Sequence, residues 1–209
     1  MISFLLHPAY FPPIAVFAAI VQAETVWFEA FDNYQKQTFR NRMYLYASNG
    51  KQTLTVPVKH THSTGRQLYK NVQIENDFNW QKIHWRTLQT AYRTSPFFEY
   101  YEDDIYPLFH EPKTSLFELN LESIQLVCDC LQIEKSFKFT SEYLKNYNSQ
   151  EITDYRYLVN AKNQQAYNFD TYTQVFGQKY GYLQNLSILD LLFNEGPQAV
   201  DFLMNQKLT

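Results

Sequence analysis

The first 28 residues constrain the fold of this chain more than any other stretch. Ile2 to Leu6 is a short apolar run that is typical of a buried strand. His7-Pro8 ends the run, because the residue before a proline is held extended and proline cannot join a ladder. Pro12-Pro13 then opens a helix whose apolar residues recur at helical spacing as far as Val21. A second apolar strand, Thr25 to Phe28, completes the strand–helix–strand pattern of a parallel sheet.

Four later runs are predicted to add strands to this beginning. Met43 to Tyr46 and Gln52 to Val58 flank Asn49-Gly50, a pair that favours the turn of a hairpin. Val72 to Ile74 and Phe137 to Phe139 are further candidate strands. We therefore predict an α/β fold, with a mostly parallel Rossmann-like sheet, helices on both faces and a helical C-terminal part.

The second half of the chain is expected to be rich in helices. One helix begins near Asn79, and a second follows Ser95-Pro96, where a capping serine precedes a proline at the first helical position. Ser115 and Glu118 have the spacing of a capping box and start a third helix.

The remaining part of the chain is expected to form a polar surface segment followed by helices. Residues 146–165 are rich in Gln and Asn and are interpreted as a long surface excursion. A helix is predicted over 185–194, with Ser187 and Asp190 as its capping box and Gly196 at its C-terminal cap. We expect residues 1–209 to form a single domain, with a sheet-containing core over 1–140 and a largely helical extension over 141–209.

Composition excludes several classes of protein. The net charge of -3 gives no general attraction to nucleic acid. No run is long and apolar enough to span a membrane, and the first residues lack the pattern of a signal peptide. Two cysteines, Cys128 and Cys130, are too few for a disulfide framework, so we expect a cytoplasmic protein. No glycine-rich phosphate loop is present.

His7 and Tyr10 stand where the first strand gives way to a helix. Ligands of open α/β sheets bind outside the carboxyl ends of the strands, and a helix N-terminus offers free N–H groups to an anion. His7 is therefore a candidate acid or base, and Tyr10 a candidate binding residue. The alternative is a histidine that is hydrogen-bonded at a strand end without a chemical role.

A dense polar and basic cluster follows the second strand and is expected at the same edge of the sheet. Glu29 and Asp32 are candidate catalytic carboxylates. Arginine presents a planar fork that suits phosphate or carboxylate, so the cationic and amide side chains nearby are candidates for binding an anion. These binding candidates are Asn33, Tyr34, Lys36, Arg40, Asn41 and Arg42. The alternative is a solvated loop of ion pairs.

Lys59, His60 and His62 form a third polar group. Alternate residues of an extended segment share a face, but a zinc site needs three or four ligands and the two histidines have no matching partner. We therefore predict no metal site, and we assign Lys59 as a further cation for substrate binding.

Six segments of the chain carry a family resemblance. They start at His7-Pro-Ala-Tyr-Phe-Pro-Pro, Asn33-Tyr-Gln-Lys, Leu54-Thr-Val-Pro-Val-Lys, Ala91-Tyr-Arg-Thr-Ser-Pro, Gln174-Val-Phe and Asn185-Leu-Ser-Ile-Leu-Asp. Together they resemble the WbqC-like protein family. The resemblance extends in order over nearly the whole chain and implies a bacterial cytoplasmic protein. Some members of this family are encoded among genes for O-antigen or other surface polysaccharides, which implies a role in modifying sugars. His7 stands where many members have Gln.

Two hypotheses for function follow. The first is a transferase that acts on a nucleotide-linked sugar or an activated acyl or amino-acid donor in surface-polysaccharide metabolism. The second is a non-catalytic module that binds a glycan or a protein through a tyrosine-rich groove, since the chain has 17 Tyr. The expected partner is an anionic small molecule, such as a nucleotide or nucleotide sugar. No cofactor is required by the sequence, and a homodimer is left open.

Overall fold

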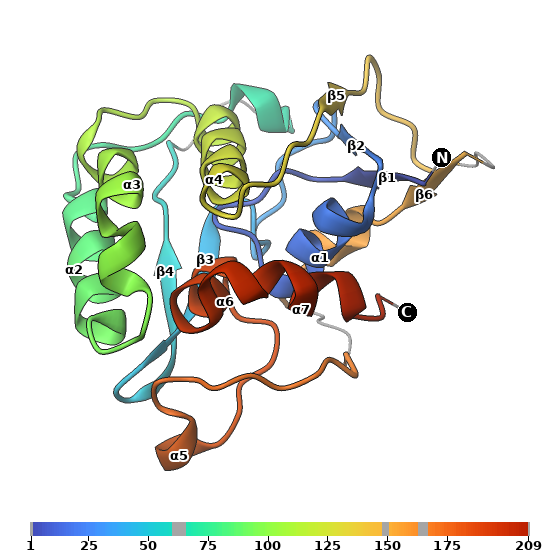
Figure 1. Ribbon diagram of the computed structural model, residues 1–209. Helices are drawn as coiled ribbons and strands as arrows, with labels where there is room; N and C mark the ends of the chain where they lie inside the picture. Colours follow the sequence, from blue (N-terminus) through green and yellow to red (C-terminus); the bar gives the residue numbers. More distant parts are fainter. Residues whose placement is uncertain (1, 60–65, 148–150, 163–166, 209) are drawn as a thin grey trace.

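A four-stranded parallel sheet lies at the upper right of the view in Figure 1. The computed structural model describes residues 2–59, 66–147, 151–162 and 167–208. The strands lie in the order β5-β2-β1-β6, and every neighbouring pair is parallel. Their bounds are β1 Ser3–Leu6, β2 Thr25–Phe28, β5 Phe137–Phe139 and β6 Ile152–Asp154. The predicted α/β class with a mostly parallel sheet is confirmed.

Helix α1 (Ile14–Gln22) connects β1 to β2 as the sequence predicts. Eight of its residues are buried, because it packs on β1 and is covered by α6 (Ile188–Glu195) and α7 (Ala199–Asn205). Its N-terminus is capped by a distant segment: the backbone N–H of Ala15 donates to Asn185 Oδ1 at 2.9 Å, and that of Ile14 to the carbonyl of Leu186. These bonds satisfy donors that every helix start leaves free.

An antiparallel hairpin, β3 (Arg42–Ala47) and β4 (Gly50–Thr55), stands apart from the parallel sheet. Ala47 pairs with Gly50, so the two turn residues are Ser48 and Asn49 rather than Asn49 and Gly50. The predicted hairpin is thus confirmed with its turn moved by one residue. Gly50 adopts φ 102°, which an L side chain rarely takes.

Three long helices are neighbours in chain order, since α3 (Phe98–His110) packs against both α2 (Trp80–Tyr92) and α4 (Leu116–Cys130) (Figure 1). Ser115 caps α4 as predicted, because its Oγ accepts from the N–H of Glu118. The prediction for α3 was wrong in detail. Ser95 donates its hydroxyl to the carbonyl of Tyr92 and so closes the end of α2, while α3 begins only at Phe98.

The chain ends in the helices α6 (Ile188–Glu195) and α7 (Ala199–Asn205), which pack against each other. Ser187 caps α6, but Asp190 does not complete a capping box. Its carboxylate accepts instead from the buried hydroxyls of Tyr92 and Tyr172. The remaining elements are η1 (Tyr69–Asn71), η2 (Arg156–Val159), α5 (Gly177–Tyr180) and η3 (Gly196–Gln198).

Two expectations about extended segments were wrong. The Gln/Asn-rich stretch 146–165 contains β6, which pairs with β1 and completes the sheet, in addition to η2. Conversely, 72–74 forms only isolated bridges: Ile74 pairs with Val58, and Gln73 with Ser115. Residues 72–74 therefore join two loops and add nothing to the sheet.

The strand order creates a switch point beside β1. The chain proceeds from β1 to β2 and β5 on one side, and then crosses to β6 on the other side of β1. Ligands of open α/β sheets bind outside the carboxyl ends of the strands at such a point. In the part of the chain that the structure describes, no helix is long and apolar enough to cross a membrane.

Candidate active site

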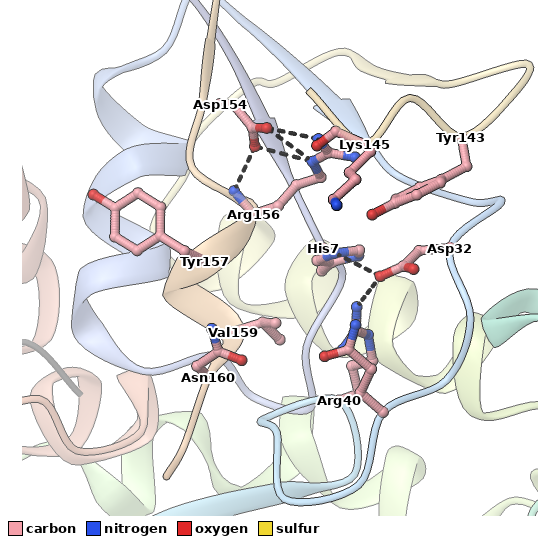
Figure 2. A pocket seen from close by; sticks show the side chains of 11 residues that line it. His7, Asp32, Arg40, Tyr143, Lys145, Asp154, Arg156, Tyr157, Val159 and Asn160 are labelled. Atoms are coloured by element: carbon pink, nitrogen blue, oxygen red, sulfur yellow. Dashed lines mark hydrogen bonds and ion pairs between the residues drawn. The ribbon is translucent and has the colours of Figure 1, made fainter. Parts of the chain in front are cut away.

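His7 follows the last residue of β1 and is nearly buried, with 5% of its surface exposed. The proline after it holds the chain extended, so the imidazole is fixed at the carboxyl end of the central strand. Its Nε2 lies 3.3 Å from Oδ2 of Asp32, which follows β2 (Figure 2). Its Nδ1 is buried and has no hydrogen-bond partner among the described residues.

Arg40 shares the carboxylate of Asp32 with His7. Its Nη2 donates to Asp32 Oδ2 at 2.8 Å, and its guanidinium lies 5.2 Å from the ring centroid of Tyr69. Only 1% of Arg40 is exposed, and the side-chain amide of Asn120 in α4 donates a hydrogen bond of 2.6 Å to the backbone carbonyl of Arg40. Asp32 also accepts from the backbone N–H of Asn33. The three side chains therefore form a rigid histidine–aspartate–arginine cluster.

A second ionic cluster lies at the carboxyl end of β6. Arg156 donates to both carboxylate oxygens of Asp154 and to Glu29 Oε2 at 3.2 Å. Glu29 is fully buried, and its other oxygen accepts from Thr140 and from the N–H of Phe31. Glu29 thus holds the guanidinium of Arg156 in place, and it does not itself line the cavity beside His7.

The environment sets the charges of the first cluster. Burial, together with the charges of Arg40 and Arg156, lowers the pKa of His7 to about 4, and Asp32 opposes this shift only in part. His7 is therefore neutral near pH 7. Burial raises the pKa of Asp32, but the interaction with His7 and the charge of Arg40 outweigh it, so the net shift is downward. Asp32 is ionised and balances Arg40.

These clusters line one pocket of about 300 Å³, which we call the switch-point pocket. It opens beside the ends of β1 and β6, where the topology predicts a ligand site. Figure 2 shows His7 between Arg156 and Arg40, with Tyr143 and Lys145 on one side and Tyr157 on the other. The lining residues are His7, Asp32, Gln35, Arg40, Tyr143, Lys145, Asp154, Arg156, Tyr157, Val159 and Asn160.

The other predicted binding residues form a separate groove of about 870 Å³. The segment after β2 separates the two cavities, since Asp32, Gln35 and Arg40 line the pocket while their neighbours line the groove. We call this second cavity the basic groove. Its lining includes Tyr34, Lys36, Gln37, Asn41, Arg42, Thr55, Lys59, Arg66, Gln67, Glu75 and Phe78.

Tyr10 and Asn33 line neither cavity. Tyr10 is fully buried, and its hydroxyl lies 3.1 Å from Nδ1 of His84, which is a core contact. The backbone of Asn33 bridges to Leu68. The sequence therefore predicted one site, whereas the structure distributes its residues over a pocket, a groove and the core.

Sequence reasoning missed the pocket residues that come from the β6 region. Asp154 and Arg156 lie in the stretch that was interpreted as a surface excursion, and Tyr143 and Lys145 precede it. No local signal marked this region, because the three residues of β6, Ile152–Asp154, are too few to show a strand pattern.

Within residues 2–59, 66–147, 151–162 and 167–208, no three His, Cys, Asp or Glu side chains are grouped as a metal site would require. His60 and His62, the pair considered for zinc, lie outside the described residues. The cationic side chains of both cavities are suited to phosphate or carboxylate groups.

Comparison with known proteins supports the family and adds no activity. The chain is 27% identical over 197 residues to the uncharacterized protein Rv1507c of Mycobacterium tuberculosis, covering 81% of this chain and 83% of that protein. No solved structure matches. The model of the WbqC-like protein family matches residues 7–202, which include both cavities. The chain therefore belongs to the WbqC-like protein family.

Proposed function

We propose that this protein is a transferase that acts on a nucleotide-linked sugar or on an activated acyl or amino-acid donor, with its reaction centre in the switch-point pocket. The observation that carries the proposal is the histidine–aspartate–arginine cluster of His7, Asp32 and Arg40 at the carboxyl ends of β1 and β2. A neutral imidazole, held by a carboxylate beside buried cations, is a common arrangement for proton transfer next to an anionic substrate.

His7 serves as the general base in this proposal through Nδ1, which has no hydrogen-bond partner among the described residues, because Nε2 keeps its hydrogen toward Asp32. A hydroxyl or amino group of the acceptor loses its proton to the imidazole as its oxygen or nitrogen bonds to the transferred carbon. The bond from that carbon to the leaving group breaks, and the electron pair departs with the leaving group. Lys145 and Arg156 line the same pocket and would stabilise the negative charge that develops there.

An anionic donor would itself make His7 a stronger base. The positive charges of Arg40 and Arg156 are two of the causes that lower its pKa to about 4. A phosphate or carboxylate bound beside these guanidinium groups offsets their charge, so the pKa of His7 rises toward its usual value. The base therefore becomes effective only when a donor is bound.

The biological setting is proposed from the family and the resemblance. We place the reaction in bacterial surface-polysaccharide metabolism, in the cytoplasm, where nucleotide-activated sugars are used. The pocket volume of about 300 Å³ suits a monosaccharide or amino-acid unit and is small for a whole nucleotide sugar. The transferred unit, rather than the whole donor, is the part that would occupy it.

The experiment is a turnover assay with purified protein, donor panels and sugar acceptors, followed by mass spectrometry. The donors are UDP-N-acetylglucosamine, UDP-glucose, dTDP-glucose, acetyl-coenzyme A and glycyl-adenylate. We expect one class to be consumed, with His7→Gln lowering kcat by about 10²–10⁴-fold. The matched control is Lys207→Ala, an exposed side chain after α7 that lines neither cavity. Full turnover by a folded His7→Gln protein would refute the assigned role.

A glycan-binding module is the second candidate, because two tyrosines flank the switch-point pocket. Tyr143 is 41% exposed and Tyr157 38% exposed, and sugar rings pack well on such half-exposed aromatic faces. This candidate predicts that an oligosaccharide binds without any donor being consumed, and that Tyr143→Ala weakens binding while His7→Gln does not. Calorimetric titration of the same variants separates the two functions.

A further inference from the structure

The basic groove contains four cations that no described acidic side chain neutralises. Lys36, Arg42, Lys59 and Arg66 line it together with a single carboxylate, Glu75. Among the described residues, none of the four cations is within 4.0 Å of an Asp or Glu oxygen. By contrast, both arginines of the switch-point pocket are paired with carboxylates. The basic groove therefore carries a local excess of positive charge, although the net charge of the protein is -3.

The walls of the groove are held in place by backbone hydrogen bonds. The N–H of Val56 donates to the carbonyl of Asn41 at 2.8 Å, and the Asn41 side chain returns a bond to the carbonyl of Val56 at 3.0 Å. The N–H of Tyr34 donates to the carbonyl of Gln67, and that of Lys59 to the carbonyl of Gln73. The cations therefore project from a fixed frame, which reduces the ordering cost of binding an anion.

The groove also offers flat aromatic surface beside its charges. Phe78 is 65% exposed, which is unusual for so large an apolar side chain, and it lies at the groove together with the half-buried ring of Tyr34. Tyr34 is in turn supported by Tyr69, with ring centroids 6.4 Å apart. Every nucleobase has a face that stacks on such rings. A ligand that carries both a planar base and several negative charges matches this lining.

We infer that the basic groove binds a nucleoside diphosphate, with its phosphates on the four cations and its base against Phe78 and Tyr34. The volume of about 870 Å³ accommodates a nucleotide, whereas the switch-point pocket of about 300 Å³ does not. The assignment of this nucleotide to the donor rests on the proposed function. The groove would then hold the activating group of the donor, while the smaller pocket holds the unit that is transferred.

Calorimetric titration with a series of probes tests the inference. We expect affinity to rise from uridine to UMP to UDP and to decrease steeply with salt, because the phosphates provide most of the attraction. The double variant Lys36→Ala/Lys59→Ala removes two exposed cations and should bind UDP about 100-fold more weakly, since each charge-assisted contact accounts for about tenfold. Lys207→Ala, outside both cavities, should bind UDP as the wild type does.

A further variant examines the aromatic contact. Phe78→Ala removes an exposed ring without opening the core, and it should weaken UDP binding about tenfold while leaving inorganic pyrophosphate binding unchanged. The melting temperature of each variant shows whether it is folded. If pyrophosphate and UDP bind equally well to the wild type, nucleoside recognition is refuted.

The results that would refute nucleotide binding in the groove differ from those that would refute the proposed transferase function. UDP that binds with the same affinity to the wild type and to Lys36→Ala/Lys59→Ala would overturn the groove assignment, as would no binding at all. If only the transferase chemistry is wrong, UDP still binds in the groove and no donor is consumed. If only the groove is wrong, turnover persists in the double variant with an unchanged KM for the donor.

Discussion

His7 and His84 are two buried histidines that both stay neutral near pH 7, for partly different reasons. Burial lowers the pKa of each to about 4. For His7 the nearby arginines add to the effect of burial, whereas His84 lies in the core beside the hydroxyl of Tyr10. Only His7 lines a cavity next to charged groups. Protonation of His84 would therefore affect folding, and protonation of His7 would affect both folding and chemistry.

The lowered pKa of His84 predicts a loss of stability in acid. Between pH 6.5 and about 4 the unfolded chain binds a proton at this residue and the folded chain does not, so the free energy of unfolding decreases as the pH falls. The slope from one such group reaches at most about 1.4 kcal/mol per pH unit. Urea unfolding of His84→Asn at several pH values should show a shallower decrease than the wild type.

The raised pKa of Asp190 predicts the opposite dependence of unfolding free energy on pH, over a similar range of pH. Burial raises its pKa to about 6, although the hydroxyls of Tyr172 and Tyr92 oppose the shift. Because the folded pKa lies above the unfolded one, this group's contribution to stability is present in acid and is lost as the pH rises through about 6. Asp190→Asn should therefore make the acid-induced decrease in unfolding free energy steeper than in the wild type. An identical slope in both proteins would contradict this.

At the scale of elements, the start of α1 depends on a cap that comes from the other end of the chain. Asn185 has φ 53° and places its side chain on the N–H of Ala15. Asn185→Gly keeps the left-handed backbone and loses the cap, so it should reduce the free energy of unfolding by about 1 kcal/mol. Asn185→Ala should cost about 1–2 kcal/mol more, because alanine does not favour that conformation. If chemical denaturation shows that both variants lose the same free energy of unfolding, the backbone conformation at residue 185 does not contribute to the difference expected here.

Sequence patterns predicted the elements whose neighbours along the chain define them. β1, α1 and β2 form a local unit with apolar periodicity and proline boundaries, and all three are present. β6 was missed because three residues, Ile152–Asp154, carry no recognisable pattern and become a strand only by pairing with β1. Val72 to Ile74 was misassigned for the converse reason, since its bonds go to separate loops.

The site residues that could be predicted were likewise those whose position follows from nearby elements of the sequence. His7 and Asp32 were predicted together because both follow neighbouring strands, and they do meet. Arg156 contacts Glu29 across 127 positions of sequence, a distance over which no local pattern gives information. The separation of Arg40 from Arg42 into two cavities depends on the path of one loop and was likewise not predictable.

At the scale of the whole molecule, Glu29 connects the carboxyl ends of three strands. It follows β2, bonds Thr140 after β5 and pairs with Arg156 after β6. Arg156→Met would leave the buried carboxylate of Glu29 without this cation and should cost about 3–5 kcal/mol of unfolding free energy. The matched control is Arg93→Met, which breaks an exposed pair with Glu102 and should cost at most about 1 kcal/mol. Similar losses in denaturant unfolding would show that the buried network is not structurally central.

The central claim is that His7 is a neutral base in a pocket where an anionic donor activates it. Nitrogen-15 NMR of labelled imidazoles measures this directly, with the His7 signal assigned by its absence from His7→Gln. We expect His7 to titrate with a pKa of about 4 in the free protein, and this pKa should rise when the donor identified by turnover is added. A His7 that titrates near 6.5 in the free protein and does not respond to the donor would contradict the account.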